Sequence, residues 1–266
     1  MSTNQSMTLS DAKEIMGIPD QKAYAMEVIP SDVLIPRLLL MQGLSEFVKN
    51  RQAQLGDIVK STTLDAVGGP DKDLTFIPLS FKNSWALGVK PPGASRYKFA
   101  GIEKRTAENS DLPWDYFVNA DGREVSSNSP GAMAAKRTKS IEVFALLPTD
   151  VDAEAAEKSK AAKGEFPDLT KALTPVQIVF RSTSFNAGQK VVTFFTQARS
   201  MKADPSNYQL TLGCFSKEND QGGFYCFDVK GTPKAASPEH AKVAKLWASI
   251  LNSTSVRVDE GDSDVV

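Results

Sequence analysis

The chain has 266 residues, of which 41% are hydrophobic, and a formal net charge of −1. This length suffices for one large domain or two small ones, and we favour a single elaborated domain with a sizeable core. No apolar run of about 18 residues predicts a membrane span, and no basic-then-apolar leader predicts secretion. We therefore expect a protein of the cytoplasm.

Residue counts also exclude several kinds of chemistry. One histidine, His240, and two well-separated cysteines do not make a zinc site or a serine–histidine–aspartate triad. The chain has neither a GxxxxGK[ST] nor a GxGxxG segment to hold a phosphate. We expect a protein that is not an enzyme and uses no metal or cofactor, with His240 exposed to solvent.

Residues 1–30 are polar and predict an N-terminal segment that is partly disordered. The apolar run 35–42 predicts a buried strand, and 44–51 predicts one or two helical turns. Residues 56–59 and 74–81 follow as strands on either side of a Gly-Gly-Pro-Asp turn.

The pattern becomes irregular between residues 82 and 139, where Pro, Gly, Asn and Ser are frequent and six aromatic residues remain. A strand is predicted at 95–102 and a mobile loop at 126–135. From residue 79 to 139, ten Lys and Arg stand against six Asp and Glu. Charges are usually a solvated surface and aromatic rings are usually core. Together, however, they match the basic groove with stacking rings that holds single nucleic-acid strands.

Regular elements return after this region. Residues 140–147 predict a strand, and 152–164 predict a solvated helix or a hinge. A half-buried strand is predicted at 176–181, followed by an amphipathic helix at 187–201 with Asn186 as its cap. Two further strands, 208–215 and 224–229, form a hairpin.

The apolar faces of the two hairpin strands define a register. Setting Cys214 opposite Tyr225 places the apolar residues of both strands on one face. Phe215 and Phe224 then become neighbours on the outer face. Cys214 and Cys226 fall on different faces, so no disulfide is expected between them.

The order strand, helix, strand, strand is the second half of an OB-fold. We therefore predict a mainly β, α+β chain: an elaborated OB-fold-like Greek-key barrel over residues 31–252, with a helix between barrel strands. A C-terminal helix begins at Ser237 and Pro238. Residues 253–266 predict a disordered acidic tail.

The residues that combine positive charge or an aromatic ring with this layout are the candidate nucleic-acid-binding residues. They are Lys82, Trp85, Arg96, Tyr97, Lys98, Lys104, Arg105, Trp114, Tyr116, Lys136, Arg137, Lys139, Phe215 and Phe224.

A hairpin followed by an acidic tail with an apolar end resembles the single-stranded DNA-binding proteins of tailed bacteriophages, in particular the T7-type group. The resemblance implies a role in phage DNA replication and recombination. It also implies that the tail contacts the phage polymerase or helicase. The tail residues concerned are Asp259, Glu260, Asp262, Asp264 and Val266. Such proteins are commonly dimeric or weakly associating, and the sequence leaves a homodimer open.

A second hypothesis comes from another functional class. A phage structural or host-interaction protein would use the same aromatic residues as the core of a protein interface, without needing the basic excess.

Overall fold

The computed structural model describes residues 34–43, 45–94, 97–168, 171–219, 222–253 and 257–258. Arg96, the N-terminal segment 1–30 and the acidic tail residues 259–266 lie outside these ranges. The strands are β1 (Leu34–Ile35), β2 (Arg37–Leu40), β3 (Ile58–Lys60), β4 (Ala66–Gly68), β5 (Leu74–Lys90), β6 (Lys98–Lys104), β7 (Asp115–Val118), β8 (Glu124–Val125), β9 (Met133–Leu146), β10 (Val176–Arg181), β11 (Tyr208–Asn219), β12 (Gly222–Ala235) and β13 (Arg257–Val258). The helices are α2 (Glu46–Lys49), α3 (Pro148–Ala162), α4 (Phe185–Ser200) and α5 (Pro238–Ser253), with short 3₁₀ turns η3 (Ser182–Ser184) and η4 (Pro205–Asn207).

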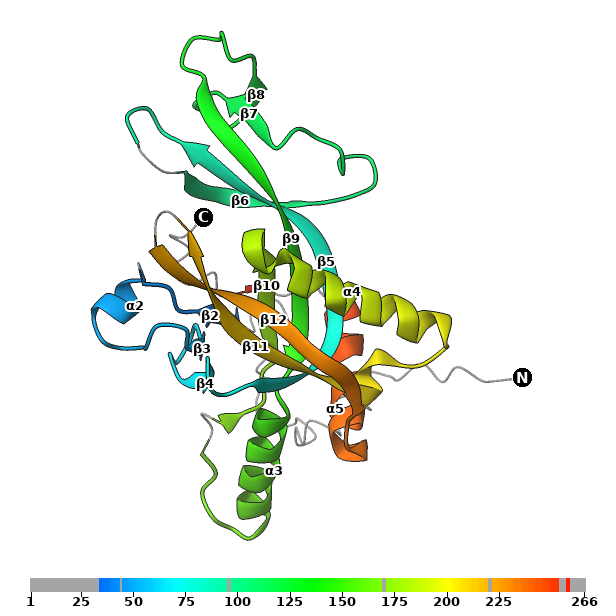
Figure 1. The fold of residues 1–266 in the computed structure, drawn as a ribbon. Coiled ribbons are helices and arrows are strands. Elements are labelled where there is room, and N and C mark those ends of the chain that lie inside the picture. Colours follow the sequence, from blue (N-terminus) through cyan, green and yellow to red (C-terminus); the bar gives the residue numbers. More distant parts are fainter. Residues whose placement is uncertain are drawn as a thin grey trace, which may run out of the picture.

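Most strands join one eleven-stranded sheet in the order β12-β11-β5-β9-β10-β2-β3-β4, with β6 beside β5 and with β7 and β8 beside β9 (Figure 1). The mainly β, α+β class is confirmed. The sheet is not closed into the predicted Greek-key barrel, because β12 and β4 end its order without pairing to each other in the described residues. No helix among those residues is long and apolar enough to cross a membrane.

The long pair β5 and β9 shapes the molecule. Their antiparallel ladder runs from Ile77 opposite Leu146 to Lys90 opposite Ala134. Its far half, with β6, β7 and β8, stands above the rest of the sheet in Figure 1. We call residues 82–139 the projection. The region expected to be irregular is therefore largely sheet, and β9 already begins inside the predicted mobile loop.

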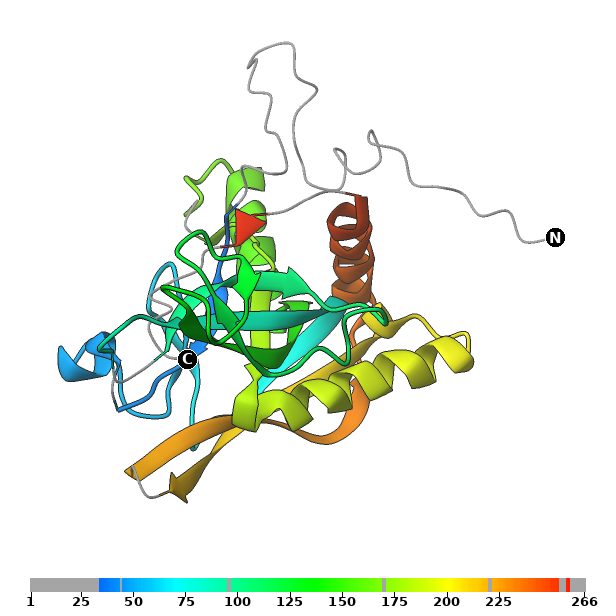
Figure 2. The same cartoon turned by 90° about the horizontal axis from the view of Figure 1, so that it is seen from above.

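The two faces of the sheet carry separate cores. Helix α4 covers one face, where Phe194 packs in a cluster with Ile141 and Phe180. On the opposite face, Ala244 of α5 and Val151 of α3 pack with Phe144. Figure 2 shows α4 and α5 on different sides of the strands. Each helix is held by its apolar stripe, because a buried large side chain contributes about 1.5–3 kcal/mol.

Both predicted long helices form, α5 with its predicted start and α4 with a start two residues earlier than predicted. Ser184, not Asn186, is the residue that precedes α4. In α5 the hydroxyl of Ser237 accepts a hydrogen bond from the His240 N–H at 3.2 Å, as the cap prediction requires. His240 was expected to be exposed, but its side chain is only 15% exposed. Its Nε2 atom lies 2.8 Å from the Oδ1 atom of Asp152 in α3. The histidine therefore joins two helices.

The hairpin of β11 and β12 pairs two residues away from the predicted register. Cys214 faces Phe227, and Phe215 faces Cys226. A shift of two residues leaves every side chain on its predicted face, because successive residues of a strand alternate. Both cysteines are free, as expected. The prediction missed the shift because both strands continue through polar residues such as Lys217, which carry no apolar pattern.

The outer edge of β12 is covered by side chains instead of a strand. The Gln42 amide accepts from the Tyr225 N–H at 3.0 Å and donates to the Tyr225 carbonyl at 2.9 Å. Farther along, the Phe227 N–H donates to the Ser184 hydroxyl at 3.0 Å, and Lys190 donates to the Val229 carbonyl at 2.9 Å. These bonds satisfy main-chain groups that an edge strand otherwise exposes.

The two ends of the described chain meet beside the sheet. Leu34 pairs with Arg257 and Ile35 with Val258 in a short parallel ladder of β1 and β13. The residues that lead into the acidic tail are therefore attached next to β2.

Candidate nucleic-acid interface

Most cations of the projection have no carboxylate partner. Among the described candidate residues, only Arg137 forms an ion pair. Its guanidinium lies 2.8 Å from the carboxylate of Glu124. The unpaired candidates are Lys82, Lys98, Lys104, Arg105, Lys136 and Lys139. Several lysines elsewhere do pair, including Lys60 with Asp150 and Lys190 with Asp228, each at 2.7 Å. The projection thus carries positive charge that its own described side chains do not neutralise.

Strand alternation divides these cations between two faces. Lys139 lies opposite Trp85 and Arg137 opposite Leu87, on the face that continues toward α4. Lys136 lies opposite Gly88 on the other face, and Lys104 lies opposite Ser84 there too. The candidate residues therefore do not line one shared groove, since neighbours along a strand point to opposite sides.

Trp85 was predicted to stack on bases, and its position excludes that role. Its exposed fraction is 0%. The indole N–H donates to the Asn109 carbonyl at 3.2 Å. The Arg105 guanidinium and the Lys139 ammonium lie 5.7 and 6.0 Å from its ring centre. Trp85 is a core residue of the projection, covered by cations whose alkyl stems shield it from water.

Trp114 keeps the exposure that stacking requires. Its exposed fraction is 57%, the largest of the aromatic candidates. The Lys139 ammonium lies 5.7 Å from its ring centre, so this cation stands between Trp85 and Trp114. An exposed ring beside an unpaired ammonium can offer a base and a phosphate adjacent contacts.

Tyr116 and Arg137 contact each other. The guanidinium carbon lies 3.7 Å from the Tyr116 ring centre, and Arg137 is 6% exposed. Arg137 also donates to the Pro113 carbonyl at 3.4 Å. Burial raises the pKa of Tyr116, an effect that the nearby Arg137 partly offsets. The contact between these two side chains therefore holds β7 and β9 together.

The remaining candidates are spread over β5, β6 and the β11–β12 hairpin. Lys98 and Lys104 are exposed on β6, and Tyr97 is half-buried just before it. Lys82 is exposed, with its ammonium 5.2 Å from the Phe144 ring centre. On the hairpin, Phe215 is 39% exposed. Phe224 is half-buried opposite Lys217, so the two rings are not directly paired as predicted.

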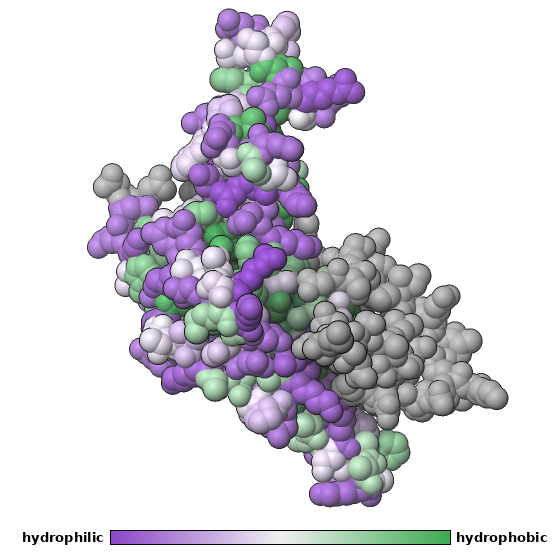
Figure 3. Space-filling view, turned by 90° about the vertical axis from the view of Figure 1, so that its right-hand side faces the viewer, coloured by the Kyte–Doolittle hydropathy of each residue, from purple (hydrophilic) through white to green (hydrophobic). Residues whose placement is uncertain are grey.

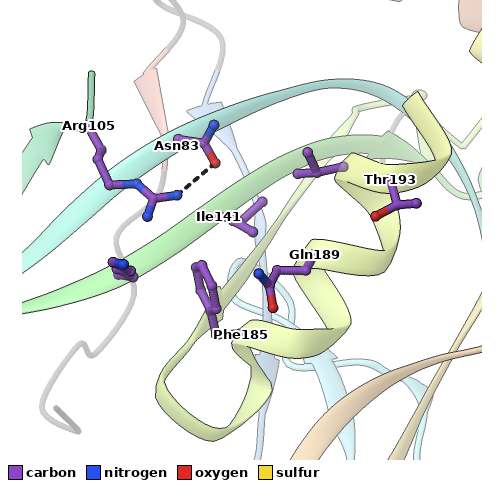
Figure 4. A pocket seen from close by; sticks show the side chains of 8 residues that line it. Asn83, Arg105, Ile141, Phe185, Gln189 and Thr193 are labelled. Carbon is purple, nitrogen blue, oxygen red and sulfur yellow. Dashed lines mark hydrogen bonds between the residues drawn. The ribbon is translucent and has the colours of Figure 1, made fainter. Parts of the chain in front are cut away.

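A pocket of about 290 Å³ lies where the projection meets α4 (Figure 4). Its lining residues are Asn83, Arg105, Lys139, Ile141, Phe185, Gln189, Val192 and Thr193. Arg105 donates to the Asn83 side-chain oxygen at 3.2 Å, and its guanidinium carbon lies 5.7 Å from the Phe185 ring centre. Burial lowers the pKa of Arg105. The pocket therefore places two unpaired cations opposite a ring and polar side chains.

Sequence reasoning identified Arg105 and Lys139 but missed the α4 wall of this pocket. Gln189 and Thr193 are exposed polar positions of an amphipathic helix, which normally indicates a solvated face. The one available signal was their spacing of four residues, which places them on one side of the helix.

Figure 3 shows hydrophilic residues predominating on the projection, with small hydrophobic areas among them.

Comparison with known proteins places the chain in a family. No curated protein and no solved structure matches it. Residues 21–257 match the family model described as Pam3 phage gp34-like protein. This match covers well over half of the chain and confirms the bacteriophage origin that the resemblance implied. The chain therefore belongs to the family of Pam3 phage gp34-like proteins.

Proposed function

We propose that this bacteriophage protein binds single-stranded DNA through its projection, without strong sequence preference and without catalysing a reaction. The observation that carries the proposal is the group of cations that have no carboxylate partner in the described residues, next to the exposed ring of Trp114. Phosphates would displace counterions from the cations, and bases would stack on the ring.

The proposal includes the role of the tail. Val258 pairs with Ile35 in the short ladder of β1 and β13, which gives the tail a fixed starting point beside the large sheet. Eight residues reach at most about 28 Å when extended. Their acids would compete with phosphate for the projection and, once displaced, would be available to a phage polymerase or helicase. The protein would act in the host cytoplasm during replication or recombination, and a homodimer is compatible with this role.

Salt dependence tests the proposal. Fluorescence anisotropy of a labelled oligonucleotide of about 30 nucleotides is measured with the full chain at several salt concentrations. Affinity should fall steeply with salt, because each phosphate contact on a single strand contributes about 0.7 to the log–log slope. Changing Lys98, Arg105 and Lys139 together to Gln should reduce the slope by about 2, because these cations lie on the face that carries Trp114.

A matched variant controls for net charge. Lys163, Lys202 and Lys242 are exposed, lie outside the projection and form no ion pair in the described residues. Changing these three to Gln removes the same charge and should leave the slope unchanged. If the full chain does not bind at low salt, or if the two triple variants behave alike, the proposal is wrong. Absence of binding at low salt would favour the hypothesis of a phage structural or host-interaction protein.

A further inference from the structure

The pocket between the projection and α4 has the composition of a site for an anion attached to a flat group. Arg105 and Lys139 supply positive charge from the projection, and the described residues that line the pocket include no carboxylate. Neither cation has an ion pair in the part of the chain that the structure describes. Burial lowers the pKa of Arg105, and no described acidic residue offsets that effect. An anion entering the pocket would supply the missing counter-charge.

The opposite wall offers contacts of a different kind. Phe185 presents a ring that the Arg105 guanidinium already approaches at 5.7 Å, and Ile141 and Val192 add apolar surface. Gln189 and Thr193 present an amide and a hydroxyl from the next turns of α4 (Figure 4). An amide can donate and accept hydrogen bonds at once, as recognition of a base edge requires.

Helix α4 adds to the positive field of the pocket. Phe185 and Gln189 belong to the first two turns of this helix of 16 residues. The preceding residue, Ser184, makes no side-chain cap to the helix, because its hydroxyl accepts from the Phe227 N–H. The N-terminal end of a helix favours negative charge, so it acts in the same direction as the two cations.

We propose that this pocket holds one nucleotide of the bound strand. Its phosphate lies between Arg105 and Lys139, its base lies against Phe185, and the edge of the base meets Gln189. A volume of about 290 Å³ lies just below the roughly 300–1,000 Å³ of typical small-molecule sites, so the pocket is assigned to one nucleotide and not to two. This inference rests on the proposed function and assigns the pocket as the anchor of the strand.

The test uses single nucleotides with the full chain. ¹H–¹⁵N correlation spectra are recorded during titration with deoxythymidine monophosphate, thymidine or inorganic phosphate. The nucleotide should shift the signals of Phe185, Gln189 and Thr193 at lower concentration than either fragment. Gln189→Leu should weaken nucleotide binding about tenfold, the loss expected when a hydrogen bond of about 1.4 kcal/mol is removed.

The matched control lies on the same helix. Gln197 is exposed on α4 and does not line the pocket, so Gln197→Leu should bind the nucleotide like the unchanged chain. Equal binding by inorganic phosphate and by the nucleotide would overturn the inference, since the base would then contribute nothing. If the oligonucleotide binds with a steep salt slope while the nucleotide leaves the pocket signals unmoved, the pocket assignment is wrong and the proposed function stands. If the full chain does not bind the oligonucleotide at all, the pocket assignment and the proposed function are both wrong.

Discussion

The guanidinium carbon of Arg137 lies 3.7 Å from the centre of the Tyr116 ring, and this contact joins β9 to β7. Arg137 also donates to Glu124 at 2.8 Å, so the same side chain reaches β8. A residue that looked like a phosphate contact in the sequence instead holds three strands of the projection in place.

Arg137→Met keeps an unbranched apolar stem but removes the charge and the hydrogen bonds of the guanidinium. We expect the free energy of unfolding to fall by about 1–3 kcal/mol, because a charged hydrogen bond and a cation–π contact are both lost. Urea denaturation measures this change. Arg123→Met is the control, since Arg123 is exposed and forms no ion pair in the described residues. Unchanged stability of Arg137→Met would contradict the structural role.

Trp114 and Trp85 should respond in opposite ways to the same substitution. Trp114→Ala should weaken oligonucleotide binding by about 1–3 kcal/mol, the contribution of one stacked base, and should leave stability nearly unchanged. Trp85→Ala should destabilise the fold by about 3–5 kcal/mol, because it empties a fully buried site. Anisotropy and urea denaturation of both variants check this pair. A stable Trp114→Ala variant with full affinity would remove the ring from the interface.

Removing residues 259–266 tests the acidic tail while keeping the ladder of Val258 with Ile35. We expect tighter oligonucleotide binding at low salt, because four carboxylates no longer compete for the projection. The difference from the full chain should shrink as salt screens both interactions. A version with Asp259, Glu260, Asp262 and Asp264 changed to Asn and Gln keeps the length of the tail. If this variant binds the oligonucleotide with the affinity of the full chain, the negative charge of the tail is not what weakens binding.

Gln42→Leu removes both hydrogen bonds to the main chain of Tyr225. Stability should fall by about 1–3 kcal/mol, since the N–H and the carbonyl lose their partner. The clearer measurement is amide hydrogen exchange, which should accelerate at Tyr225 more than at Leu212 in the core. Gln52→Leu, an exposed position near α2, is the control. Equal exchange in both variants would mean that Gln42 does not protect the edge.

Elements with a strong local pattern could be predicted from the sequence. β10 has the predicted bounds, Val176–Arg181, because this run is rich in β-branched and aromatic residues, although Gln177 is buried as well. α5 begins where Ser237 and Pro238 indicate. These predictions depend on neighbouring residues alone.

The projection depends on contacts that are distant in sequence. Residues 136–139 are Lys, Arg, Thr and Lys, and they form a strand because β5 and β7 pair with them. Nothing in that composition predicts a strand. The burial of Trp85 follows from Arg105 and Lys139 lying near its ring, which the sequence alone does not indicate. The candidate cations were found, but their division between two faces needed the pairing register.

The amide of Gln42 on Tyr225 limits how neighbouring molecules can associate. On the β12 border, both main-chain groups of Tyr225, the Phe227 N–H and the Val229 carbonyl are already bonded to side chains, so a second molecule cannot use these four groups to extend the sheet. Contacts between adjacent copies would then form through side chains, which separate more readily than a continuous ladder. If the protein coats DNA as proposed, such a coat would therefore come apart more easily than one built on shared strands.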